Sequence, residues 1–299
     1  MKLKIKKAVV GIVIIVMATS TVLLIRSFVL SRLKSALHQK LEAINKTEFK
    51  VHYDSLYVRW RDHVIVVDGL VIAKDAYDTL CVHPEFISAR QVQIKGFHLL
   101  KLLFARKLNL EKVVIHQPHM VIREQSQLFG DSLKKKQNEF ALAIDRLILD
   151  SLHIEYTDRA SCRLNNEYFS TLEAKDLSLS IHTDKPLELS LGALRLDNTR
   201  LRFPQEFYTV QILKTQFNAS TRSLTIDTLK IVPHLTKLEF GKKKGYDIDR
   251  IEGVIPFVKL LGFRYRYQDT LSFAADRVNL QSFLRLFHDK QLPHKKVKK

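Results

Sequence analysis

From Phe49 onward, apolar and polar residues alternate in short runs such as Leu177, Leu179 and Ile181. A period of two is typical of β-strands with one buried face, because successive side chains point to opposite sides. Before Phe49 the period is different, since apolar residues recur at steps of three and four between Leu30 and Ile44. The pattern therefore predicts a helical start followed by a β-rich body.

A longer pattern recurs within the β-rich part. It consists of one apolar position, two spacers, an apolar pair two residues apart, two more spacers, and a second alternating apolar set. Leu110, Val113 and Ile115 followed by Pro118, Met120 and Ile122 form one copy. About seven matches in one chain indicate a structural repeat. The copies cover residues 65–72, 89–99, 110–122, 144–156, 191–203, 248–260 and 275–287.

The two spacers between the apolar sets are residues that favour turns. Such dipeptides tolerate positive φ angles, so they predict two-residue hairpins that keep both apolar sets on one face. A β-bulge within a single strand would have the same effect and remains an alternative. In the copy around Pro118 the step is expected to be open or bulged, because proline cannot donate the hydrogen bond of a regular hairpin. The spacers are Asp68-Gly69, Lys95-Gly96, His116-Gln117, Asp150-Ser151, Asp197-Asn198 and Gln281-Ser282.

These elements predict a mainly β protein, an elongated and twisted antiparallel sheet with one apolar face. Short helices are expected only at residues 99–107, 134–143 and 282–287, too few to cover that face. Two arrangements would shield the apolar face from water: a closed sandwich or barrel, and an open groove filled by a ligand.

The N-terminus has the pattern of a membrane anchor. Residues 8–25 contain 18 residues without a charge, about 27 Å as a helix, which is close to the thickness of a bilayer core. A cleaved signal peptide would have a shorter apolar run, so an uncleaved anchor is the better interpretation. Basic residues flank the anchor equally on both sides, so charge alone does not give its orientation. A leader of seven residues is easily left in the cytoplasm, so the rest of the chain is expected on the other side of the membrane. The expected segments are a leader (1–7), an anchor (8–25), an amphipathic helix (26–46), a first sheet section (47–123), a polar link (124–143), a second sheet section (144–289) and a basic tail (290–299).

The amphipathic helix needs a partner for its apolar face. Packing against the following domain and lying along the membrane surface are both open.

The net charge of +18 lies mainly at the ends of the chain. Residues 1–50 carry ten Lys or Arg and two acidic residues, and residues 251–299 carry ten and four. This distribution fits basic flanks around an anchor and a basic tail, and it argues against a central nucleic-acid groove.

The sequence offers no catalytic constellation. Glycine-rich phosphate loops, nucleophile elbows and metal motifs are absent. His116 and His119 lie close together, but two ligands do not complete a zinc site. Neither an enzyme activity nor a cofactor nor a metal site is therefore expected. Cys81 and Cys162 could pair or stay free, so they do not indicate the redox compartment.

The anchor and continuing helix, followed by "ISARQVQIKGFHLLKLLFARKLNLEKVVIHQPHMVIRE", resemble the N-terminal region of AsmA-like envelope proteins. Residues 226–263 and the ending "FLRLFHDKQLP" are similar to longer, Bacteroidetes-type members. In those relatives the sheet continues past this ending, whereas this chain stops at Lys299. About 14 to 16 strands, roughly 4.8 Å apart, would extend only about 70 Å, too short to bridge an envelope alone.

The resemblance implies a single-pass protein of the bacterial inner membrane with a periplasmic, lipid-binding groove. Its partners would be phospholipid acyl chains, the inner membrane and other envelope proteins, and its role phospholipid transport or outer-membrane lipid homeostasis. The alternative is an anchored periplasmic scaffold or assembly module with a closed β core. Ten residues of the repeats are expected to line the groove: Val113, Ile115, Met120, Ile122, Leu147, Leu149, Ile154, Leu194, Leu196 and Leu201.

Overall fold

The computed structural model describes residues 49–59, 61–74, 85–96, 107–123, 140–158, 164–182, 185–203, 207–245, 249–268 and 270–287, together with Ser31 and Ser35. The expected anchor (8–25) and basic tail (290–299) lie outside these residues. Of the expected helix at 26–46, only Ser31 and Ser35 are described, both as helical. Within the described residues, no helix has the length and hydrophobicity that crossing a membrane requires.

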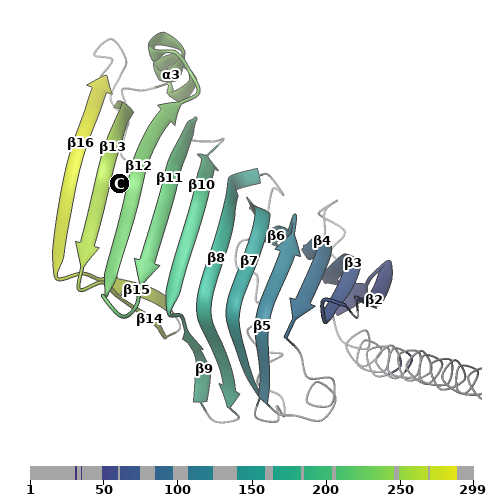
Figure 1. Ribbon diagram of the computed structural model, residues 1–299. Helices are drawn as coiled ribbons and strands as arrows, with labels where there is room; N and C mark the ends of the chain where they lie inside the picture. Colours follow the sequence, from purple (N-terminus) through teal and green to yellow (C-terminus); the bar gives the residue numbers. More distant parts are fainter. Residues whose placement is uncertain are drawn as a thin grey trace, which may run out of the picture.

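The described chain is mainly β, with one large twisted sheet and one short helix (Figure 1). The elements are β1 (Phe49–His52), β2 (Ser55–Arg59), β3 (Val64–Lys74), β4 (Phe86–Lys95), β5 (Lys107–His116), β6 (His119–Arg123), β7 (Phe140–Thr157), β8 (Leu164–His182), β9 (Lys185–Ser190), β10 (Ala193–Phe203), β11 (Tyr208–Asn218), β12 (Ser223–Pro233), α3 (Lys237–Lys244), β13 (Arg250–Leu261), β14 (Arg264–Gln268), β15 (Thr270–Ala274) and β16 (Arg277–Phe287).

The sheet contains 14 strands in the order β1-β3-β4-β5-β7-β8-β10-β11-β12-β13-β16, with β2, β6 and β9 beside this path. The expectation of a purely antiparallel sheet is wrong at one junction. β5 and β6 pair with β7 in parallel, while the other pairs of the sheet are antiparallel. A parallel pair cannot be joined by a tight turn, which separates this junction from the hairpin-type pairs of the sheet.

Two of the expected helices are strands in the residues that the structure describes. Residues 282–287 belong to β16, and residues 140–143 begin β7, four residues inside the expected polar link. Strong pairing overrides the helical spacing, since β7 and β16 bond along their lengths to β8 and β13. The helix expected at 99–107 lies outside the described residues except for Lys107, which starts β5.

The repeated two-residue step is a positive-φ interruption along a strand and not a hairpin turn in most copies. Gly69, Ser151 and Asn198 have φ angles of 62°, 60° and 52° and lie inside β3, β7 and β10. Gln117, with a φ of 49°, separates β5 from β6, which continue in the same direction beside β7. Lys95-Gly96 lies at the end of β4. The hairpin interpretation is therefore wrong for these copies. The bulge alternative is correct at Ser151 and Asn198, where the register shifts, whereas the register continues unchanged past Gly69 and Gln117.

These positive-φ residues lie in one row across the sheet, which we call the crease. Gly69 and Gln117 both flank Arg90, Gln117 lies beside Ser151, and Asn198 and Thr228 both flank Leu213. All five occur on strands that run in the same direction: β3, β5–β6, β7, β10 and β12. Registers shift by one residue beside the crease, at Leu149/Leu152 and at Asp197/Arg200. The strands bend near their middles, as Figure 1 shows for β5, β7 and β8.

Thr228 is the most strained member of the crease, because a β-branched residue rarely adopts a φ of 50°. Thr228→Gly is expected to raise the free energy of unfolding by about 1 kcal/mol, since the left-handed penalty disappears. Thr225→Gly, in the same strand without a positive φ, should lower it by up to about 1 kcal/mol. Urea unfolding of both variants tests this, and equal destabilisation by both would contradict the assigned conformation.

Candidate functional site

Pairing registers place the apolar residues of successive strands opposite one another on one face of the sheet. Val113 is opposite Leu147, Leu147 is opposite Ala174, and Ala174 is opposite Leu194. The row continues through Phe217 and Leu224 to Leu260 and Val278 on β16. We call this side the apolar face, and it extends from β3 to β16.

All ten residues expected to line a groove lie on the apolar face. Ile115 and Leu149 are paired, Leu149 and Leu196 share the partner Leu172, and Ile154 and Leu201 share Tyr168. Val113 is buried, and the other nine are partly exposed. The remaining members of this set are Met120, Ile122, Leu147 and Leu194.

Exposure of the apolar face increases along the sheet. Near β4, β5 and β7 its side chains form a buried core, with Ala89 and Val113 only 6% and 7% exposed. At the β16 end, Val278 and Leu280 are each 59% exposed and Leu284 is 48% exposed. The apolar face is thus a core at one end and an open hydrophobic surface at the other.

Helix α3 closes one side of this open surface, at one end of the strands (Figure 1). Its Phe240 is 1% exposed and packs edge to face on Tyr208, with ring centroids 5.4 Å apart. A capping box of Thr236 and Glu239 begins the helix, and Gly245 with a φ of 73° ends it. The Tyr208 hydroxyl accepts a hydrogen bond from the Ile251 backbone N–H at 2.9 Å, which ties this corner to β13.

The β14–β15 hairpin closes the opposite side. Phe217, which lies on the apolar face of β11, contacts Phe263 and Tyr265 edge to face at 5.6 and 5.7 Å. Phe263 also stacks on Phe273 of β15. The hairpin lies at the ends of β11 and β12 away from α3 (Figure 1). In the C-terminal half, aromatic clusters therefore border the apolar face at both ends of the strands. Between these borders the apolar face continues from strand to strand.

The other side of the sheet, the polar face, carries a chain of hydrogen bonds beside the crease. Gln91 donates to the Asp68 carboxylate at 2.8 Å, as does the Ser55 hydroxyl. These two hydrogen bonds, the one from Gln91 first, lower the pKa of Asp68. His116 contacts the Asp150 carboxylate at 3.2 Å. Asp68, Asp150, Asp197 and Asp227 each precede a positive-φ residue, so these aspartates belong to the crease.

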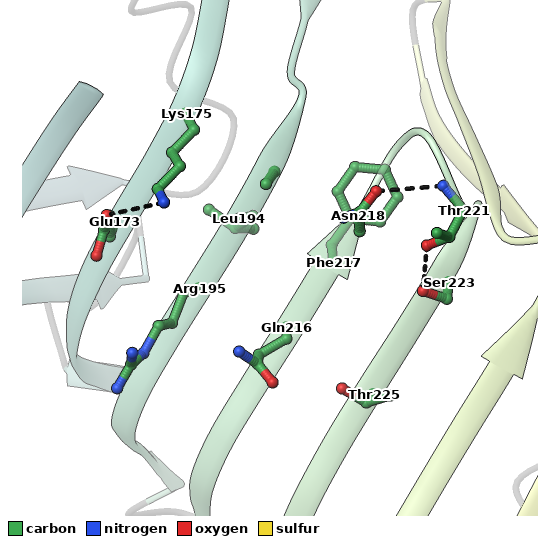
Figure 2. A pocket seen from close by; sticks show the side chains of 11 residues that line it. Glu173, Lys175, Leu194, Arg195, Gln216, Phe217, Asn218, Thr221, Ser223 and Thr225 are labelled. Carbon is green, nitrogen blue, oxygen red and sulfur yellow. Dashed lines mark hydrogen bonds and ion pairs between the residues drawn. The ribbon is translucent and has the colours of Figure 1, made fainter. Parts of the chain in front are cut away.

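A shallow cavity of about 430 Å³ lies between β8, β10, β11 and β12. Figure 2 shows Glu173, Lys175, Arg195 and Gln216 around it. Its cations already have partners, since Lys175 lies 3.9 Å from Glu173 and Arg195 lies 2.7 Å from Asp197. The cavity therefore presents little unbalanced charge to an ionic ligand.

The structure separates the two histidines of "VVIHQPHMVI". His116 points to Asp150, while His119 contacts Glu155 at 3.0 Å and stacks on His153. Sequence spacing missed this second cluster, because its members come from β6 and β7 and meet only through the parallel register of His119 with His153. Among the described residues, this is the one group with the geometry of a metal site.

No known protein family has a model that matches this chain, and no curated protein matches it.

Proposed function

We propose that this protein binds lipid acyl chains on its apolar face and takes part in phospholipid transport or lipid homeostasis in a bacterial envelope. The observation that carries the proposal is the continuous apolar face from β3 to β16, which remains open at β16. Burying aliphatic surface releases about 25 cal/mol per Å², so acyl chains need no further chemistry to bind there. The mechanism is passive shielding and requires no catalytic residue.

The length of the sheet limits what one copy can do. The sheet has 14 strands, within the expected 14 to 16, but they are not fully stacked. β1 and β2 share the neighbour β3, and β5 and β6 follow one another along β7, so the path has eleven rows. At about 4.8 Å per row the eleven rows span about 48 Å, and the apolar face from β3 to β16 is about 43 Å long. We infer that the described sheet shields a lipid for part of a passage between two membranes. The AsmA-like resemblance implies that residues 8–25 anchor the protein in the inner membrane.

Photocrosslinking in native membranes tests the proposal. A photoreactive amino acid at Ile115 or Ile154, both on the apolar face, is expected to capture phospholipid. The matched control is Val114, which lies between Val113 and Ile115 on the polar face and is opposite Gln93. Mass spectrometry identifies the adducts, and capture of protein alone at Ile115 and Ile154 would overturn the proposal.

A second function, an assembly module, is supported by the edge strand β16. Among the described strands, β16 pairs with β13 alone, and Val278, Leu280, Phe283 and Leu284 are exposed on it. An exposed apolar edge can accept a strand from another protein. Protein adducts from a photoreactive residue at Leu280, with no lipid adducts at Ile154, would favour this function over lipid binding.

A further inference from the structure

The cluster of His119, His153 and Glu155 lies on the polar face, away from the lipid-binding surface. Nitrogen and oxygen atoms of these three side chains lie within 4.8 Å of one another. His119 Nε2 is 3.0 Å from Glu155 Oε1, and His153 Nε2 is 3.7 Å from the same oxygen. His119 comes from β6, while His153 and Glu155 are two residues apart on β7.

We propose that His119, His153 and Glu155 form a binding site for a divalent transition-metal ion of the Zn²⁺ type. Two imidazoles and one carboxylate are a donor set that Zn²⁺ accepts, and a fourth position is then left for water or another ligand. The site is independent of the lipid-binding function, because it lies on the opposite face.

The donor distances are close to those of a metal site. Tetrahedral ligands about 2.05 Å from Zn²⁺ lie about 3.3 Å apart. The His119–Glu155 distance of 3.0 Å and the His153–Glu155 distance of 3.7 Å bracket this value. The two imidazole planes are nearly parallel, at 4°, so each ring must turn about its terminal torsion to point Nε2 at the ion. Such sp³–sp² torsions are broad, so the rings can turn to bind the ion.

The surroundings hold the ligands in place. The His153 ring lies between the His119 ring and the Phe169 ring, with centroids 4.5 and 4.2 Å away, and Phe86 packs edge to face on His119. His153 Nε2 is buried and lacks a hydrogen-bond partner within the described structure. An orphaned nitrogen of this kind costs free energy unless a ligand satisfies it.

Charge also favours a cation here. Glu155 lies directly opposite Glu167 in the β7–β8 register, and two carboxylates at such a position repel. Arg202 pairs with Glu167 at 3.2 Å, whereas the ion-pair partners described for Glu155 are the two imidazoles. Burial, and secondly the neighbouring His119, lower the pKa of His153.

A bound ion would join β6 to β7, the parallel junction of the sheet.

The test is a Zn²⁺ titration of the full chain, purified without a histidine tag, by calorimetry and by competition with a zinc indicator. The unmodified protein is expected to bind Zn²⁺, and Glu155→Gln and His119→Gln should each weaken this binding by at least about tenfold. His116→Gln is the matched control, because His116 lies three residues from His119 but pairs with Asp150.

A thermal readout separates coordination from folding. Zn²⁺ should raise the Tm of the unmodified protein and of His116→Gln, and should leave the Tm of Glu155→Gln and His119→Gln unchanged. Equal zinc affinity in all four proteins, or binding lost in His116→Gln as much as in His119→Gln, would assign the metal to other surface histidines and overturn the proposal. Failure of the unmodified protein to bind Zn²⁺ would also overturn it, without affecting the lipid-binding proposal.

Discussion

Leu149→Asn and Leu196→Asn are each expected to weaken the binding of an acyl-chain probe by at least about tenfold. Both side chains lie on the apolar face, opposite the same residue, Leu172. Replacing a leucine that contacts the probe removes about 1.5 kcal/mol or more of hydrophobic burial and adds an amide that the acyl chain cannot satisfy. Displacement of a fluorescent fatty-acid probe from the full chain in detergent measures the affinity.

Ile148→Asn is the matched control for Leu149→Asn. Ile148 is the next residue of β7 but is opposite Glu173 on the polar face. Its replacement should leave probe binding within about twofold of the unmodified protein, because the acyl chain does not contact that side. Similar losses for Ile148→Asn and Leu149→Asn would show that the substitutions act through folding, and would contradict binding on the apolar face.

Phe240→Ala is expected to lower the free energy of unfolding by about 3 to 5 kcal/mol, the second large effect. Phe240 is 1% exposed and fills the space between α3, Phe207 and Tyr208. An eight-residue helix is marginal without tertiary packing, so loss of this ring should detach α3 from the sheet. Chemical unfolding gives the free energy, and hydrogen exchange in residues 237–244 shows where the structure opens.

Leu238→Ala, in the same helix, provides the control. Leu238 is 67% exposed, so its truncation should change the free energy of unfolding by less than about 0.5 kcal/mol. If Phe240→Ala were as mild as Leu238→Ala, α3 would not be packed on the sheet as described, and that side of the apolar face would be open.

Alternation alone predicted which side chains share a face. In a strand, period two assigns each residue to a side before its neighbour is known, so the ten expected residues could be grouped without any pairing information. The two-residue step left a choice, because a hairpin and a bulge both return the apolar set to the same side. Only the direction of the next strand distinguishes them, and direction depends on contacts far along the chain.

Other features depended on information that no short pattern contains. The parallel pairing of β5 and β6 with β7 brings together residues about 34 positions apart, and the histidine cluster follows from that register alone. For α3, the Thr236–Glu239 capping box was visible in the sequence, but the helix has a single buried aromatic residue and little apolar periodicity. The helix is stabilised by packing on the sheet, and the spacing of nearby residues cannot predict that contact.

The crease also bears on how such a sheet could change in size. Its positive-φ residues lie on β10 and β12 but not on the antiparallel β11 between them or on β13, so β10 with β11 and β12 with β13 are equivalent two-strand units. Inserting or deleting one such unit would keep every strand direction, every bulge and the facing of every apolar side chain. Each unit would alter the apolar face by about 9.6 Å. Duplication of a single hairpin is therefore a route by which a longer or shorter protein of this architecture can arise without redesign of its core.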